Sequence, residues 1–261
     1  MDRYDTVIIG AGHNGLVCAG LLAKAGQRVL ILEASDQAGG LAAAHEFHEG
    51  YRAPAAHSVG HFAEPVAKAL DLERHGLRWG DSSPLVGLGD NGAHRIIRGR
   101  TLSGASAADS AAWPAFHERL EAFARALEPY WLETIPRVAK APLPELAIFG
   151  RMGWSLRRMG KADMREFLRQ FALPTRDLVD EHFEDEVLKA LISWDGLIGS
   201  RMAPRSPNNA VLMMLYRMAG RSVESTGNLV SALEAAARDA GVTIRTDTRV
   251  TRLHLETAEH G

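Results

Sequence analysis

Three glycines near the start of the chain have the spacing of a phosphate-binding turn. Gly10, Gly12 and Gly15 form a G-x-G-x-x-G pattern directly after the β-branched run 6–9. In such turns the first glycine permits a tight bend, the second lets backbone N–H groups approach a pyrophosphate, and the third allows close helix–strand packing. The following helix N-terminus offers unpaired N–H donors to phosphates. The pattern predicts a dinucleotide site; a purely structural turn is the alternative.

An acidic residue stands where a ribose-binding carboxylate is expected. Glu33 directly follows the strand candidate 28–32 and lies 18 residues after Gly15, close to the spacing of about 20 in dinucleotide-binding units. A carboxylate here hydrogen-bonds a ribose hydroxyl and repels a 2′-phosphate, which disfavours NADP. These residues alone leave the choice between NAD and FAD open.

The elements around the turn predict an α/β fold. Strand 6–9, a helix from Leu16 that stops at Gly26, and strand 28–32 have the size of a βαβ unit. Near the C-terminus, Asn228 is expected to cap a helix that ends at Gly241. Two strand candidates follow this helix, at 242–245 and 250–255.

The middle of the chain has a different pattern. Segments 77–79, 85–88 and 94–97 indicate a small β element with a hairpin. A helix capped by Asp109 or Ser110 is expected next, because apolar residues recur there at intervals of three and four. Further helices are predicted at 164–171, 176–183, 186–192 and 209–218.

The turn and a second glycine pair together resemble a known flavoprotein family. Residues 7–17, followed by 32–34 and 39–42, are similar to the N-terminus of the phytoene-dehydrogenase-like FAD-dependent oxidoreductases. That family includes carotenoid desaturases and mitochondrial proteins named for a pyridine nucleotide-disulfide oxidoreductase domain. Gly39 and Gly40 would let a second loop approach the diphosphate and flavin without side-chain obstruction. The resemblance therefore implies FAD as the cofactor.

The resemblance also implies which residues contact FAD. They are Gly10, Gly12, His13, Asn14, Gly15, Glu33, Ala34, Gly39, Gly40, Leu41 and Ala42, with Val250 contacting the adenine through its backbone. One departure lies at 226–228, where Thr-Gly-Asn stands in place of the glycine pair more usual in the family. The implied reaction is dehydrogenation, desaturation or saturation of a small organic substrate, apolar and isoprenoid-like, by hydride transfer to or from the flavin. No residue is identified as a catalytic acid or base.

We expect a discontinuous Rossmann-type FAD-binding domain. Residues 1–58 and 227–261 would form it, and residues 59–226 would form a mostly helical, mixed α+β substrate or cap region. Members of the family are nearly twice as long, so we expect an N-terminal portion with an incomplete FAD site. The alternatives are an NAD-dependent dehydrogenase that uses the same turn, and a non-catalytic binding or regulatory protein.

Composition narrows the class of protein further. The 30 Lys and Arg against 32 Asp and Glu give a net charge of −2, which argues against a nucleic-acid partner. No apolar run approaches the roughly 20 residues of a transmembrane helix, and we expect a cytoplasmic protein. Arg157, Arg158 and Lys161 are interpreted as a solvated face, with peripheral membrane contact left open. The oligomeric state is not predicted.

Several other residues are expected to have structural rather than catalytic roles. Cys18 is the only cysteine, which excludes an internal disulfide, and a buried thiol is expected. The polar residues in 45–49 are interpreted as surface, and no metal site is expected. His57, beside Ser58, is expected to make a structural hydrogen bond. The aromatic residues of the predicted helix are expected in a core: Trp113, Phe116 and Phe123.

Overall fold

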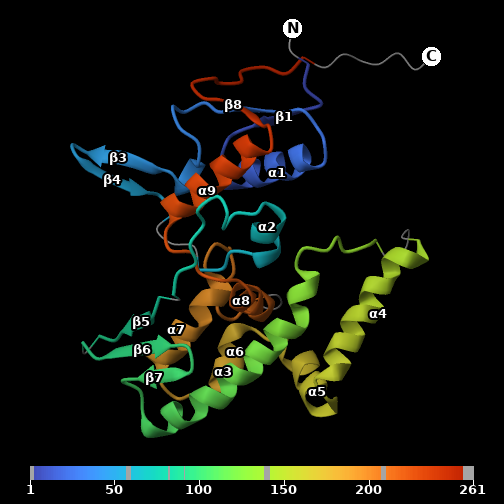
Figure 1. Ribbon diagram of the computed structural model, residues 1–261. Helices are drawn as coiled ribbons and strands as arrows, with labels where there is room; N and C mark the ends of the chain where they lie inside the picture. The colour runs from blue at the N-terminus through green and yellow to red at the C-terminus, as the bar shows by residue number, and fades with distance from the viewer. Residues whose placement is uncertain are drawn as a thin grey trace. The chain divides into compact units, whose positions relative to one another are not determined.

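The chain forms two compact units. A computed structural model describes residues 3–56, 60–81, 83–90, 92–137, 142–206 and 210–254. Met1–Asp81 and Arg221–Gly261 form the first, which we call the discontinuous unit, and Ser82–Gly220 form the second, the inserted unit (Figure 1). The discontinuous unit extends past the boundary expected at residue 58. That the two units serve cofactor and substrate respectively stays a prediction.

A parallel sheet covered by two helices organises the discontinuous unit. Its strand order is β1-β2-β8, with Ile8 opposite Ile31 and Ile31 opposite Ile244. The strands are β1 (Thr6–Ile9), β2 (Val29–Leu32) and β8 (Thr243–Arg245), and the helices are α1 (His13–Lys24) and α9 (Thr226–Asp239). Leu16 of α1 and Leu233 of α9 share one buried core with Ile31. The predicted βαβ unit and Rossmann-type α/β fold are confirmed.

Smaller elements complete this unit. They are the 3₁₀ turn η1 (Gly40–Ala42), the hairpin strands β3 (Ala44–His48) and β4 (Tyr51–Pro54), and the helix α2 (Glu64–Ala69). The hairpin holds the expected polar surface at 45–49. The assignment of 77–79 to the middle β element is wrong, because Trp79 pairs with Val223 within the discontinuous unit.

Three further expectations for the discontinuous unit are wrong. Ser225, three residues before Asn228, caps α9, because its hydroxyl accepts from the Asn228 N–H. The Asn228 side chain instead accepts from the Arg78 N–H at 2.7 Å and donates to the Gly76 carbonyl at 2.7 Å. Residues 250–254 carry no strand; Leu255 lies outside the described residues. Cys18 is exposed, because Leu16 and Ala19 set the buried face of α1.

The inserted unit combines a small antiparallel sheet with a helical core. Its strands are β5 (Leu85–Leu88), β6 (His94–Arg98) and β7 (Thr101–Ser103), in that order. Its helical elements are α3 (Ala107–Leu127), η2 (Glu128–Tyr130), α4 (Leu143–Arg158), α5 (Lys161–Gln170), α6 (Thr175–Asp180), α7 (Glu186–Leu197) and α8 (Ala210–Ala219). Trp113, Phe116 and Phe123 are buried in its core, as predicted. No described helix is long and apolar enough to cross a membrane.

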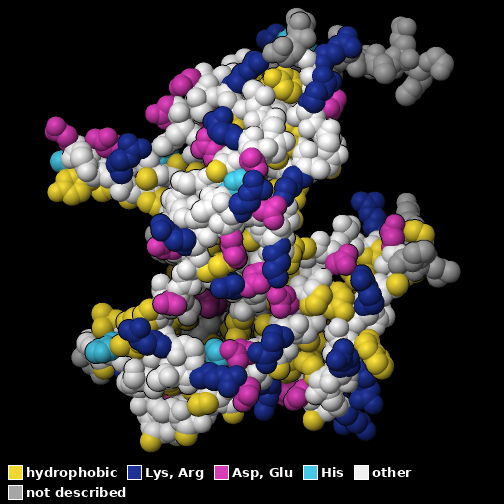
Figure 2. Space-filling model, in the orientation of Figure 1, with side chains coloured by type: hydrophobic (Ala, Val, Ile, Leu, Met, Phe, Trp, Pro, Cys, Tyr) yellow, Lys and Arg dark blue, Asp and Glu magenta, His cyan; other side chains and the backbone are white. Residues whose placement is uncertain are grey.

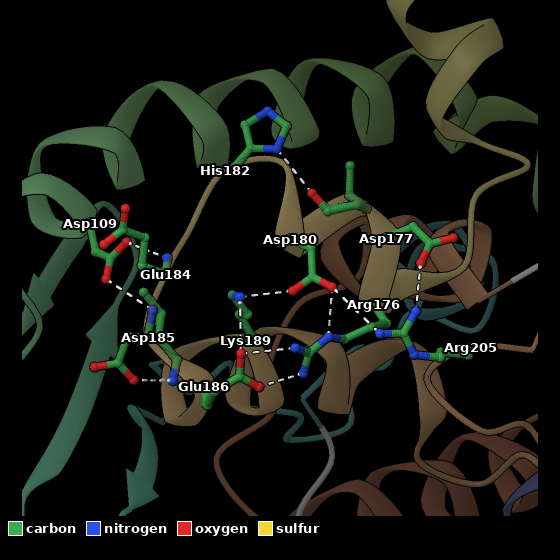
Figure 3. Close-up of polar contacts among 12 residues, drawn as sticks. Asp109, Arg176, Asp177, Asp180, His182, Glu184, Asp185, Glu186, Lys189 and Arg205 are labelled. Atoms are coloured by element: carbon green, nitrogen blue, oxygen red, sulfur yellow. Dashed lines mark hydrogen bonds and ion pairs between the residues drawn. The ribbon is translucent and has the colours of Figure 1, made fainter.

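The cap of α3 differs from the prediction. Ser106 caps the helix by accepting from the Asp109 N–H. The Asp109 carboxylate, 2% exposed, instead accepts from the backbone N–H groups of Glu184 and Asp185, at 3.0 and 3.3 Å (Figure 3). A buried carboxylate thus satisfies two donors just before α7 begins, which ties α7 to α3.

A charged network joins α6 and α7 (Figure 3). Arg176 donates from two nitrogens to Glu186, at 2.6 and 2.8 Å, and from Nε to Asp180 at 2.8 Å. Lys189 pairs with the same two acids, at 2.8 Å to Asp180 and 3.1 Å to Glu186. Hydrogen bonds from Lys189 and Arg176 hold the pKa of Asp180 below its usual value. Each charge has a partner, so the network has a structural role.

Helix α4 was not predicted from the sequence. It buries Ile148 and Leu156, two turns apart, with partly buried Met152 between them. Gly150 and Gly153 interrupt the apolar period on its other side, where a Cβ added at either position would meet nothing within 4 Å. Three inward residues are too few to signal a helix against two glycines.

Candidate dinucleotide site

The three glycines of the turn have distinct surroundings. Gly10, with φ +98°, follows β1, and its N–H donates to the Leu32 carbonyl at 2.8 Å. Gly12 is the N-cap of α1. A Cβ at Gly15 would overlap the carbonyl oxygen of Gly10. Only glycine at 15 lets α1 pack this closely against the turn.

The outer side of the turn has room for a ligand. A Cβ added at Gly10 or Gly12 would meet no atom within 4 Å. No side chain caps the N-terminus of α1, so the first-turn N–H groups and the positive end of the helix dipole are left for an anion. The turn therefore fits a pyrophosphate.

Glu33 lies directly beside this turn. Its carboxylate accepts from the Ala11 N–H at 2.6 Å and from the N–H and hydroxyl of Ser35. Burial raises the pKa of Glu33, but the hydrogen bonds from Ser35 and Ala11 outweigh it, so the pKa is lowered overall. Glu33 is held as an anionic acceptor beside the glycine turn, as a ribose-binding residue requires.

The second glycine pair packs against the first turn. The Gly39 N–H donates to the Ala11 carbonyl at 2.8 Å, and Gly39 and Gly12 form an isolated parallel bridge. A Cβ at Gly40 would lie 3.1 Å from the Cα of Gly12. A Cβ at Gly39, whose φ is +119°, would lie 2.8 Å from Val230 on α9. A side chain at Gly39 would overlap Val230, and one at Gly40 would crowd Gly12 and strain the backbone at φ +56°. Two glycine segments separated in sequence thus meet at one place.

The other residues predicted to contact the cofactor differ in their exposure to solvent. His13 and Asn14 are exposed on the first turn of α1, Leu41 is 69% exposed and Ala42 is buried. Val250 is half-buried, two residues past Thr248, whose N–H donates to the Glu33 carbonyl. The backbone after β8 thus returns to the end of β2. Which of these residues touch a cofactor stays a prediction.

Sequence reasoning missed two supporting residues. Ser35 fixes the Glu33 carboxylate, and Val230 covers Gly39. A serine two residues after an acid is a local signal for such a hydrogen bond, whereas Val230 gave no signal because its partner lies far away in sequence. His57 and Ser58 lie outside the described residues. Among the residues that the structure describes, no group of His, Cys, Asp and Glu is arranged to hold a metal.

The fold and the turn define a Rossmann-type dinucleotide-binding unit. Residues 8–69 match the model of the NAD(P)-binding Rossmann-like domain. The chain is 25% identical over 287 aligned residues to pyridine nucleotide-disulfide oxidoreductase domain-containing protein 2 of Mus musculus, covering 97% of this chain and 49% of that protein. Over 48 residues, or 18% of this chain and 8% of the relative, it is 52% identical to all-trans-retinol 13,14-reductase of Macaca fascicularis. The chain spans about half the length of the mouse protein.

Solved structures share the fold at low sequence identity. An oxidoreductase from Methanosarcina mazei matches 96% of this chain and 53% of its own, with 16% identity and a TM-score of 0.52. A putrescine oxidase variant redesigned in cofactor binding matches 92% and 50%, with 15% identity and a TM-score of 0.52. A Rab GDI from Plasmodium falciparum matches 97% and 60%, with 10% identity and a TM-score of 0.58. The architecture is thus common to proteins with different names, and the function must be argued from the site.

Proposed function

We propose that the chain binds FAD in the discontinuous unit and belongs to a flavin-dependent oxidoreductase. The observation that carries this is the meeting of Gly12, Gly40 and Glu33 around the open N-terminus of α1. The similarity to an oxidoreductase domain-containing protein over 97% of this chain supports it.

Each part of the site would do a separate task. The N–H groups at the start of α1 would hold the diphosphate. Glu33 would orient the ribose of the adenosine half, and the Gly39–Gly40 loop would let the cofactor pass close to the backbone. Bound FAD supplies hydride acceptance or donation, while the protein binds and orients the substrate and excludes water. His13, Asn14, Gly10, Gly15, Ala34, Leu41, Ala42 and Val250 complete the proposed set of contacts.

The proposed substrate is an apolar, isoprenoid-like molecule that is dehydrogenated or saturated. The resemblance of residues 7–17 and 39–42 to phytoene-dehydrogenase-like proteins supports it, as does the local similarity to a retinol reductase. We propose that residues 59–226 contribute the substrate region. A cytoplasmic location stays a prediction from the sequence.

The test begins with the purified chain. Its visible absorption spectrum is expected to show bound flavin, or to show it after FAD is added. NAD binding at one equivalent with no affinity for FAD would instead establish the NAD-dependent alternative, and binding of neither would favour a non-catalytic protein. With oxidised FAD bound, anaerobic mixing with an apolar alkene tests dehydrogenation, in which the substrate reduces the flavin. With the flavin reduced beforehand, the same mixing tests saturation, in which the alkene reoxidises it. Primary amines are mixed with the oxidised flavin for comparison.

A further inference from the structure

Helix α4 has an exposed face that combines a large aromatic residue with small residues. Ile148 and Leu156 are buried on its opposite face, and Leu156 belongs to the core of the inserted unit. Ala147, Gly150 and Trp154 follow one another at intervals of three and four, so they share the outer face. The Trp154 side chain is 67% exposed. The Trp154 ring is therefore exposed on the surface of the inserted unit, next to the small residues Ala147 and Gly150.

Two arginines that form no ion pair within the described part of the chain follow this ring on the helix. Arg157 and Arg158 lie three and four residues after Trp154, and both are exposed. Helical side chains lean towards the N-terminus of their helix, which is the direction in which Trp154 lies from Arg157 and Arg158. Arg151 has a partner in Glu133 at 3.0 Å, whereas Arg157 and Arg158 make no ion pair with any described residue.

Helix α5 also combines basic residues with an exposed apolar residue on one face. Lys161, Arg165 and Leu168 recur at intervals of four and three on one face, and Leu168 is 51% exposed. Residues 142–165 hold five cations and two acids, in a chain whose net charge is −2. Figure 2 shows basic and hydrophobic side chains gathered over α4 and α5. The two helices thus carry a local positive charge together with exposed apolar groups.

We propose that α4 and α5 dock the protein on the surface of an anionic membrane. Tryptophan prefers the boundary between lipid headgroups and acyl chains, and arginine next to it pairs with lipid phosphates and carboxylates. Amphipathic helices that lie in this boundary combine such a cationic edge with an apolar face. The charge of the face is complementary to anionic lipid. The inference goes beyond the proposed function and does not depend on FAD.

Vesicle co-sedimentation with the purified chain tests the charge complementarity. The chain is expected to bind vesicles of phosphatidylcholine with phosphatidylserine, not those of phosphatidylcholine alone, and to be released by salt. Reversing both charges in R157E/R158E should lower the bound fraction about tenfold or more. R98E/R201E makes the same change in net charge at two exposed arginines elsewhere in the inserted unit, and should bind like the unchanged chain. Equal losses in both variants would overturn the proposal.

Tryptophan quenching tests the insertion of the ring. Lipids with brominated acyl chains should quench emission on binding, and W154A should lose most of this quenching. W194A removes another tryptophan, 53% exposed on α7, and should keep it. Circular dichroism of each variant checks the fold. Quenching that survives in W154A would overturn the proposal, as would self-association of the lipid-free chain that W154A abolishes, because the face would then bind a second copy.

Discussion

The Glu33 carboxylate accepts a hydrogen bond from the backbone N–H of Ala11, with 2.6 Å between Oε2 and the nitrogen. One acidic side chain therefore joins the end of β2 to the glycine turn after β1, across 22 positions of sequence. Ser35 donates twice to the other oxygen of the same carboxylate. The geometry holds the acid in place before any ligand arrives, so its replacement should affect binding and acid stability separately.

Glu33→Gln should weaken FAD binding by about 10- to 100-fold, because a charged hydrogen-bond acceptor is lost at the proposed ribose position. Flavin fluorescence titration measures this. Ser35→Ala, which leaves the carboxylate but frees it to move, should lose less. Unchanged affinity in Glu33→Gln would remove Glu33 from the proposed site.

Glu33 should also make stability depend on pH. Its pKa is lowered in the folded chain, so its contribution is present above the unfolded pKa and is lost as pH falls through the folded pKa. The contribution should therefore decline below about pH 4, near the ordinary value for glutamate. Urea unfolding across acidic pH should show a flatter acid limb in Glu33→Gln. An identical limb in both proteins would contradict this assignment.

Substitutions at Gly12 and Gly15 should have different effects on FAD affinity and on the free energy of unfolding. Gly12→Ala places a methyl group in open space, so the free energy of unfolding should change by less than about 1 kcal/mol while FAD affinity falls. Gly15→Ala drives a methyl group into the Gly10 carbonyl, so stability should fall by about 2 kcal/mol or more. Urea unfolding and flavin titration of both variants check the contrast. The reverse order of stability would show that the turn is not packed as described.

Asp109→Ala should destabilise the inserted unit by about 2–3 kcal/mol, because two backbone donors before α7 lose their acceptor. Asp109→Asn keeps one acceptor oxygen and should lose less. Thermal and urea unfolding give the comparison. A loss in Asp109→Asn as large as in Asp109→Ala would mean that the charge, rather than the number of acceptors, is essential.

Cys18 should react with a thiol reagent in the native protein. Its exposure on α1 predicts labelling within about tenfold of the rate in the urea-unfolded chain. Absorbance from the released chromophore follows the reaction, and Cys18→Ser supplies the blank. Protection by about a hundredfold or more would place the thiol in the core after all.

The sequence predicted the discontinuous unit well where local pattern and chemistry coincide. The turn of Gly10, Gly12 and Gly15 must sit between a strand and a helix, and Glu33 must follow the next strand, so a few residues determine the whole βαβ unit. The contact between Gly39 and Gly12 was not predicted: the resemblance implied only that the Gly39–Gly40 loop approaches the diphosphate and flavin, and no local rule places two loops together. Val230 of α9 covers Gly39, and no feature of the sequence pattern indicated this contact.

The errors share a physical origin. Ser106 and Ser225 cap their helices three residues before residues that also favour caps, and those residues were instead taken up by long-range hydrogen bonds. Trp79 finds its strand partner at Val223, far along the chain. Cap preference and β propensity depend on local sequence, whereas contacts with residues far along the chain determine the roles of Asp109, Asn228 and Trp79.

The pairing of β2 with β8 has a consequence for biosynthesis. Leu30 faces Thr243 in the sheet, with the whole inserted unit encoded between them. During synthesis Leu30 leaves the ribosome long before Thr243. The edge of β2 that pairs with β8 therefore has no partner strand until β8 has been synthesised. The inserted unit is contiguous and can mature first. The pairing of β2 with β8 therefore forms only after the inserted unit has been synthesised, and it carries the loop-closure entropy cost of that long connection.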